Sequence, residues 1–298
     1  MMTESTLKKQ VQVEVCIDSV ESAIAAVQGG ADRLELCGNL GLGGGTTPSL
    51  GLFHAIRSRF PSIAIMVMVR PRAGDFLYTK SEMEVMNADI RVFKQAGANG
   101  VVLGVLTKEG FVDVLRTQEL VNEAHPMEGT HRKDSPNILG IEPHTISTSV
   151  TFHRAFDMMS EPFDGAQGNV ASIASIHGIT RILTSGRGIT APSSLDALKS
   201  IFKEVDELNK QRDKPLIVLP GSGINPKTIS LVLEALLPLG LQEVHLSAGS
   251  WIASEMKYRP IGMNMGVGGE GEWGIWRTDE SKVASVKGII NDYVRRVV

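Results

Sequence analysis

The sequence predicts a single-domain α/β fold, a (β/α)₈ TIM barrel, and two observations carry this prediction. First, four stretches repeat a glycine, a few linking residues and an apolar run, at residues 29–36, 97–104, 177–184 and 239–246. Glycine just past a periodic segment usually ends a helix because it adopts positive φ at little cost. Second, eight strand candidates alternate with helical segments, which is typical of a parallel sheet with crossover helices. Eight such units in 298 residues favour a closed barrel over the alternative, a doubly wound open sheet.

The predicted elements follow one another along the chain in regular alternation. Strands are expected at residues 12–17, 33–37, 63–70, 100–105, 149–156, 181–185, 215–220 and 243–247. Helices are expected at residues 19–29, 48–59, 82–96, 113–124, 167–177, 194–208, 226–238 and 280–296. Thr47 and Asn225 each precede a proline and are predicted helix caps, and Ser81 with Glu84 matches a capping box.

Two segments interrupt this alternation without forming a second domain. Residues 126–148 are polar and rich in Pro, Ser and Thr, so they are expected to form a surface insertion. Residues 260–280 are rich in Gly and Met and are expected to form an irregular loop before the C-terminal helix. One domain is therefore expected over residues 1–298.

Composition narrows the class of protein. The chain is 42% hydrophobic, which supports a large core, and its net charge of −3 gives no general attraction to nucleic acid or anionic membrane. Only two cysteines are present, which fits a reducing compartment, and the first residues lack the apolar run of a signal peptide. No apolar stretch approaches the ~20 residues that span a bilayer. We therefore expect a cytoplasmic protein.

The first two strands, VEVCID and RLELCG, alternate apolar residues with acidic and sulfur-bearing ones. One face of a barrel strand packs against helices and must be apolar, whereas the other faces the lumen, where the strand ends build the active site. Glu14 and Cys16 are therefore expected to point inward from the first strand, and Glu35 and Cys37 from the second.

Other strands repeat the pattern. Arg70 stands at the end of the third strand, and His153 and Asp157 share one face of the fifth, with Arg154 on the other face. The same reasoning places Met66, Met68, Thr151, Glu243, His245 and Ser247 inward. The polar residues either form structural pairs in the lumen or, with His153 and a glutamate, transfer protons.

Two glycine motifs predict an anion site. LPGSGIN ends the seventh strand and LSAGSW the eighth, and in barrels these loops often bind phosphate through backbone N–H groups. The candidates are Gly221, Ser222, Gly223, Ala248 and Gly249. TSGRG after the sixth strand would add donors, whereas ordinary tight turns are the alternative explanation.

Cys16 and Cys37 occupy equivalent places on adjacent strands and form a candidate Cu(I) site. Two thiolates are soft ligands that suit Cu(I), and Met66 and Met68 could add thioether sulfur. The alternative is a pair of buried thiols that act as small hydrophobes. No lysine stands at an inward strand position, and neither H-x-x-x-H nor C-x-x-C occurs.

The strings VEVCIDSVESAIAAVQGGADRLELC, GGTTPSLG, VRPRAGDFLYT, VTFHRAFD, ILTSG, LPGSGIN and HLSAGSW resemble the CutC family, named for copper homeostasis. The resemblance implies a cytoplasmic barrel, often oligomeric, with Cu(I) near the cysteines that match Cys16 and Cys37. It also implies a pocket, and the matching residues are Glu14, Glu35, Arg70, His153, Arg154 and Asp157. The insertion at 126–148 departs from the family pattern.

Two functions follow from these observations. The first is a copper homeostasis protein that binds Cu(I) through paired cysteines and forms a homo-oligomer. The second is a barrel enzyme that acts on a small phosphorylated or carboxylated metabolite, with the glycine loops holding the anion and the pocket residues supplying charge and protons. A scaffold that binds partners through its surface is a third possibility, but no surface is marked for it.

Overall fold

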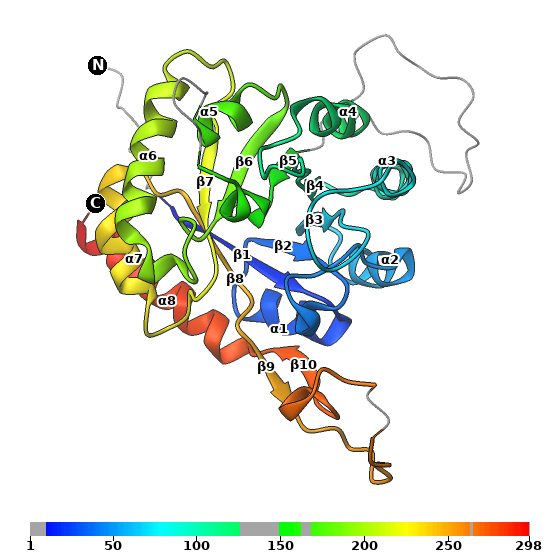
Figure 1. Ribbon diagram of the computed structural model, residues 1–298. Coiled ribbons are helices and arrows are strands. Elements are labelled where there is room, and N and C mark those ends of the chain that lie inside the picture. Colours follow the sequence, from blue (N-terminus) through cyan, green and yellow to red (C-terminus); the bar gives the residue numbers. More distant parts are fainter. Residues whose placement is uncertain (1–9, 126–148, 162–167, 263–264, 298) are drawn as a thin grey trace.

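The computed structural model describes residues 10–125, 149–161, 168–262 and 265–297, and its centre is an eight-stranded parallel sheet curved into a barrel (Figure 1). The strands are β1 (Gln12–Ile17), β2 (Arg33–Leu36), β3 (Ala64–Met68), β4 (Gly100–Leu103), β5 (Ser149–Phe152), β6 (Ile179–Thr184), β7 (Ile217–Pro220) and β8 (Glu243–Leu246). They are hydrogen-bonded in the order β7-β6-β5-β4-β3-β2-β1-β8, and β7 and β8 meet at the seam. This sequential order confirms the barrel and excludes the doubly wound sheet, whose strand order reverses.

Eight α-helices in the described part of the chain surround the strands, as predicted (Figure 1). They are α1 (Val20–Gln28), α2 (Leu50–Arg59), α3 (Lys80–Gln95), α4 (Val114–Ala124), α5 (Asn169–Ala174), α6 (Leu195–Asn209), α7 (Ile229–Leu236) and α8 (Glu280–Val297). The expected insertion at 126–148 lies outside the described residues. Among the described residues, each helix is too short or too polar to span a bilayer.

The predicted helix starts are wrong by a few residues. Ser49 caps α2, because Thr47 is engaged with the end of β3, where its Oγ1 accepts the backbone N–H of Arg70 at 3.0 Å. Asn225 instead accepts the N–H of Lys227 at 2.9 Å, a turn that precedes α7. Both prolines, Pro48 and Pro226, therefore lie in the segment before the helix rather than in its first turn.

The capping box of α3 also lies two residues earlier than predicted. Thr79 Oγ1 accepts the N–H of Glu82, and Glu82 Oε2 accepts the N–H of Thr79 at 2.7 Å. Ser81 lies inside the first turn of the helix. The T-x-x-E pattern at 79–82 satisfies the same free N–H groups as the predicted S-x-x-E pattern.

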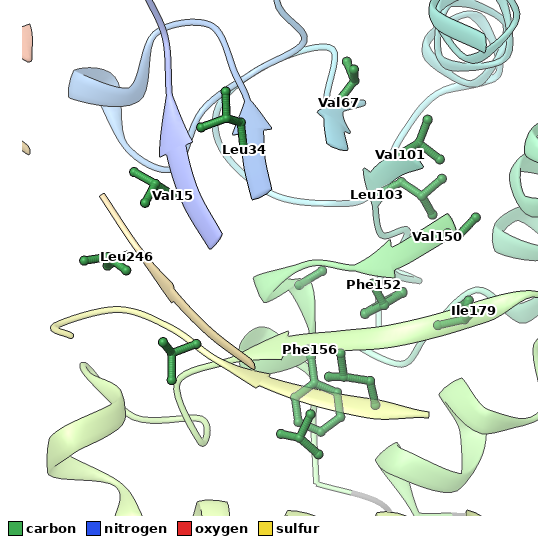
Figure 2. Packing of buried hydrophobic residues seen from close by; sticks show 14 of the residues in the cluster. Val15, Leu34, Val67, Val101, Leu103, Val150, Phe152, Phe156, Ile179 and Leu246 are labelled. Atoms are coloured by element: carbon green, nitrogen blue, oxygen red, sulfur yellow. The ribbon is translucent and has the colours of Figure 1, made fainter. Parts of the chain in front are cut away.

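Figure 2 shows the main core, which lies between the strands and the helices. Alternate residues of the strands β1 to β5 contribute to it, including Val15, Leu34, Val67, Val101 and Val150, all with no exposed surface. Each such side chain contributes roughly 1.5–3 kcal/mol of burial free energy. A second, smaller cluster lies inside the barrel and consists of Cys16, Cys37, Met66, Met68 and Val102. The predicted division of the strand faces is therefore confirmed for β1, β2 and β3.

A short antiparallel arm follows the barrel. β9 (Gly249–Ile252) pairs with β10 (Ile275–Thr278), and the rings of Trp251 and Trp276 meet edge to face at 5.4 Å. The arm projects away from the barrel (Figure 1). The prediction of an irregular loop over 260–280 is wrong at its end, because residues 275–278 are held as a strand by β9.

Candidate functional site in the barrel lumen

The register of three neighbouring strands brings the predicted acidic and sulfur-bearing residues together. Glu14 of β1 lies opposite Arg33 of β2 on one side and His245 of β8 on the other. Cys16 lies opposite Glu35. All of these side chains are buried, with relative exposures of 1–7%. The wall formed by β8, β1 and β2 therefore carries these polar and sulfur-bearing side chains together inside the barrel.

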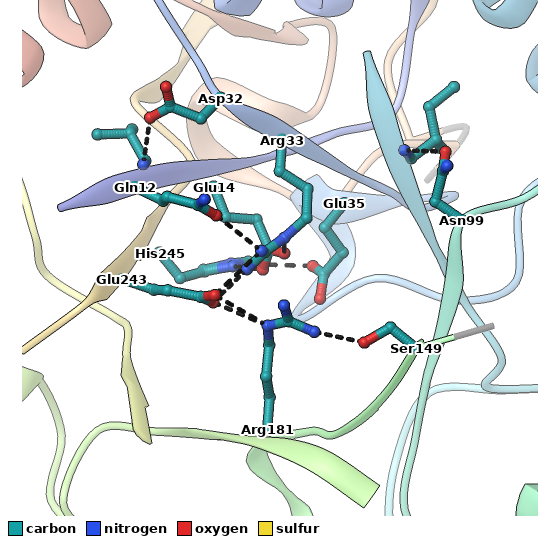
Figure 3. A network of polar contacts seen from close by, with 12 residues as sticks. Gln12, Glu14, Asp32, Arg33, Glu35, Asn99, Ser149, Arg181, Glu243 and His245 are labelled. Carbon is teal, nitrogen blue, oxygen red and sulfur yellow. Dashed lines mark hydrogen bonds and ion pairs between the residues drawn. The ribbon is translucent and has the colours of Figure 1, made fainter. Parts of the chain in front are cut away.

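An ion-pair network lies toward the N-terminal ends of these strands (Figure 3). Arg33 pairs with Glu14 and donates to Glu243 Oε2 at 2.5 Å. Arg181 of β6 donates to the same Glu243 oxygen at 2.9 Å and also bonds Ser149. Pairing of this kind offsets the cost of removing the charges from water. Sequence reasoning did not select Arg33, Arg181 or Glu243 as site residues, although Glu243 was expected to face inward.

Glu14 connects this network to His245, with which it forms a buried pair. His245 Nδ1 donates to Glu14 Oε1 at 2.8 Å, and His245 Nε2 lies 3.8 Å from Glu35 Oε2. Burial opposes ionisation of Glu14, but Arg33 and His245 outweigh it and lower its pKa to about 2. Burial also opposes charge on His245, yet Glu35 and Cys16 raise its pKa well above its ordinary value. The imidazole is thus fixed in orientation, with Nε2 directed at Glu35.

Cys16, Glu35 and His245 form a cluster of three potential metal ligands. One donor atom from each lies within 4.8 Å of the other two. Glu35 Oε2 also accepts a hydrogen bond from Cys37 Sγ at 3.4 Å, whereas its Oε1 is buried without a partner. Burial raises the pKa of both thiols, and Glu35 adds to that effect. Both cysteines are therefore protonated at neutral pH unless a cation displaces the proton.

The two thiols share their cluster with the thioethers of Met66 and Met68. Thiolate and thioether sulfur are the ligands that Cu(I) prefers, so these residues fit that ion. Gly45, at φ +76°, covers Cys37 so closely that an added Cβ would lie 2.9 Å from its Sγ. The loop after β2 can lie over the thiol only because glycine stands there.

Arg70 and His153 lie at the rim of the barrel. Arg70 is 7% exposed and donates to the carbonyls of Gly43, Gly45 and Gly74, but no carboxylate in the described chain pairs with it. His153 Nδ1 accepts the N–H of Ala155 at 3.2 Å, so Nε2 carries the proton, and that buried N–H has no partner. Burial, assisted by Arg70, lowers the pKa of His153 to about 3.

Arg154 and Asp157 form a separate group, because β5 ends at Phe152 and residues 154–158 turn into a 3₁₀ helix. The strand alternation predicted for them is therefore wrong. Arg154 Nε donates to Asp157 Oδ2 at 2.7 Å. Asp157 also accepts the N–H groups of Ser185 and Arg187. These backbone donors after β6, which were expected to face an anion, are thus occupied by a carboxylate of the protein.

The glycine loops after β7 and β8 pack tightly against neighbouring segments. Gly221 donates to Thr184, Ser222 Oγ donates to the carbonyl of Ile189, and a Cβ at Gly223 would lie 2.7 Å from Thr190. Ala248 accepts from Asp279, and a Cβ at Gly249 would lie 2.2 Å from the ring of Trp276. β8 leads into the arm rather than into a short helix. Anion binding by these residues stays a prediction.

Ser222 and Ala248 also have positive φ, at 72° and 48°. Arg187, in the loop after β6, has φ of 65°. Such conformations are costly for residues with a Cβ and often occur at functional sites. Three of the four non-glycine positive-φ residues in the described chain thus lie in the loops that follow β6, β7 and β8, and the fourth, Asn39, lies after β2.

The comparisons with known proteins agree with this geometry. The model of the CutC family matches residues 11–137 and 140–250. A family protein CutC from Chromobacterium violaceum is 38% identical over 275 residues, covering 92% of this chain and 96% of that protein. Copper homeostasis protein cutC homologs from Mus musculus and Homo sapiens are 38% and 37% identical, covering 94% and 93% of this chain and 89% and 88% of theirs.

Solved structures show the same architecture. A CutC structure from Streptococcus agalactiae superposes with a TM-score of 0.63 at 21% identity, covering 80% of this chain and 99% of that one. A ribulose-1,5-bisphosphate carboxylase/oxygenase from Pyrococcus horikoshii gives a TM-score of 0.55 at 12% identity, covering 98% of this chain and 61% of that one. At such low identity these likenesses show the fold alone.

Proposed function

The chain belongs to the CutC family, and from this premise we propose that it binds Cu(I) through Cys16 and Cys37 and serves copper homeostasis in the cytoplasm. The observation that carries the proposal is the sulfur cluster, in which two buried thiols, one on β1 and one directly after β2, lie with two methionines. Cu(I) accepts low coordination numbers and soft ligands, so two thiolates suffice to hold it.

Binding would replace the thiol protons of Cys16 and Cys37. Their pKa values are raised by burial, so the free thiols keep their protons, and a bound cation would favour the thiolates. Buried thiolates without a cation are costly, whereas a Cu(I) dithiolate carries one net negative charge. Cu(I) loading should therefore release protons, which is measurable in a weakly buffered solution.

The test is a titration of the reduced protein with Cu(I) against a Cu(I)-specific chelator. Cys16→Ser and Cys37→Ser should each weaken binding, and the double variant should lose it. Val102→Ala is the matched control, because it loosens the same cluster without removing sulfur. Equal Cu(I) affinity in the parent and the double variant would refute the proposal.

The contribution of the thioethers is tested in the same titration. Met68→Leu removes a sulfur from the lumen cluster, whereas Met86→Leu removes one from the outer core. We expect the first to weaken Cu(I) binding and the second to leave it unchanged.

The predicted homo-oligomer is measured by light scattering on the same samples, with and without copper.

A second candidate function, an enzyme acting on a small phosphorylated or carboxylated metabolite, is favoured by one observation at the rim. Arg70 is a buried cation without a carboxylate partner in the described chain, and the nearby His153 holds an N–H without an acceptor. A ligand carboxylate or phosphate would complement both groups.

This candidate is tested by thermal shift with inorganic phosphate and with small dicarboxylates. A ligand at 100 times its dissociation constant adds about 2.7 kcal/mol of stability. Arg70→Met should abolish the shift, whereas Arg72→Met, at a side chain that is 37% exposed, should not. Absence of any shift across both ligand classes would count against the enzyme.

A further inference from the structure

We infer that the lumen contains a mixed thiolate, imidazole and carboxylate site for a divalent ion of the Zn(II) class, held by Cys16, Glu35 and His245. The inference shares Cys16 with the proposed copper site but does not require that copper binds. The three donor atoms lie within 4.8 Å of one another, and all three residues are buried. Bonds to zinc are about 2.0–2.3 Å long, so short side-chain movements would bring the three donors onto one ion.

The ligands come from three consecutive strands of the barrel. Cys16 and Glu35 are direct neighbours across β1 and β2. His245 lies opposite Glu14, two residues before Cys16 on β1. Because the strand register fixes all three backbone positions, the site is built into the sheet rather than into a mobile loop.

Glu14 orients the imidazole in the way that metal-binding histidines require. Its carboxylate accepts the Nδ1–H of His245 at 2.8 Å and is itself held by Arg33. The Nε2 side of the ring is thereby directed toward Glu35, as Figure 3 shows. A carboxylate behind a ligating histidine fixes its tautomer and raises its basicity.

The charges of the lumen leave one carboxylate for a cation. Glu14 and Glu243 pair with Arg33, and Glu243 also pairs with Arg181. Glu35 has no Lys or Arg partner among the described residues. Its Oε1 is buried and accepts no hydrogen bond. The one basic group paired with Glu35 among the described residues is His245, at 3.8 Å from Oε2, so Oε1 is left as a buried oxygen that a metal ion could satisfy.

The donor set distinguishes this site from the copper site. Sulfur, nitrogen and oxygen together suit a borderline divalent ion, whereas Cu(I) prefers sulfur alone. Three protein ligands also leave a fourth position of a tetrahedral ion open. Cys37 is not one of the three, since its Sγ donates to Glu35 Oε2.

The experiment titrates the full-length reduced protein with Zn(II) against a chromophoric chelator, and with Co(II) as a spectroscopic substitute. We expect one Zn(II) per chain and, with Co(II), a thiolate-to-cobalt charge-transfer band. Cys16→Ser should abolish the band, and His245→Gln and Glu35→Gln should each weaken Zn(II) binding. Cys37→Ser should keep Zn(II) while weakening Cu(I). His177→Gln, at an exposed position, is the control for adventitious binding.

The two metals separate the two proposals. A parent protein that binds Cu(I) but neither Zn(II) nor Co(II) overturns this inference and leaves the proposed function intact. Zn(II) binding that survives Cys16→Ser, or that His177→Gln removes, overturns it as well. If His245→Gln does not fold, the cobalt spectrum of the parent decides, because a spectrum without a thiolate band excludes Cys16 as a ligand.

Discussion

His153 should make the protein sensitive to acid, and its replacement by Asn should reduce that sensitivity. Burial lowers the pKa of His153 from 6.5 to about 3 in the folded protein. Between these values the unfolded chain binds a proton that the folded chain does not, so stability falls as the pH falls through this window. The two pKa values give a loss of about 2.5 kcal/mol between pH 6 and pH 4.

His153→Asn isolates this contribution because the amide oxygen of Asn can accept the Ala155 N–H in place of Nδ1. The free energy of unfolding is measured by urea denaturation of both proteins at pH 7, 6, 5 and 4. We expect the variant to lose about 2.5 kcal/mol less than the parent between pH 6 and pH 4. Its stability at pH 7 is lower, because the ring contact with Phe76 is lost.

His177→Gln serves as the control, since that side chain is exposed. Its stability should fall with pH in parallel with the parent. If the free energy of unfolding of His153→Asn falls with pH as steeply as that of the parent, the pKa of His153 is not lowered in the folded protein, and the prediction is refuted. If the variant is less stable than the parent by the same amount at every pH from 7 to 4, the substitution changed packing alone.

Three further predictions concern stability and the copper site. Glu14→Gln should lower the free energy of unfolding by about 3–5 kcal/mol in urea at pH 7, because it leaves the buried Arg33 with one carboxylate fewer. Gly45→Ala should weaken Cu(I) binding in the chelator competition and cost about 1–3 kcal/mol of stability, because its Cβ would press on Cys37. Asp157→Asn should increase backbone hydrogen exchange after β6, because one oxygen can no longer accept from the N–H groups there.

Each of the three has a matched control. Glu123→Gln breaks a partly exposed ion pair and should change stability by less than about 1 kcal/mol. Gly43→Ala also has positive φ, but its Cβ would meet nothing within 4 Å, so copper binding should be kept. Asp75→Asn lies on the surface and should leave exchange after β6 unchanged. Equal effects of variant and control would contradict the corresponding prediction.

The barrel and the faces of its strands were predictable because both depend on local patterns. Alternation along VEVCID and RLELCG places Val15 and Leu34 outside and Cys16 and Glu35 inside, and the structure agrees. Alternation failed where the strand stopped. Arg154 was assigned a face as if β5 continued, but the chain turns at His153.

The partners within the site were harder to predict, because they depend on register. His245 meets Glu14 across 231 positions of sequence, and a shift of one residue between β1 and β8 would separate them. Sequence reasoning placed His245 on the inner face but gave no reason to prefer it over other inward residues. The E-V-H alternation at the start of β8 was the available signal.

The seam between β7 and β8 has a mechanical consequence. Those two strands end the hydrogen-bonded order of the described sheet, so the main chain does not fasten the ring there. Glu243 on β8 instead forms ion pairs with Arg181 on β6, which lies across the seam, and with Arg33 on β2. These buried ion pairs therefore connect strands on both sides of the seam. Because salt screens buried charges only weakly, the closed barrel should stay stable at high ionic strength.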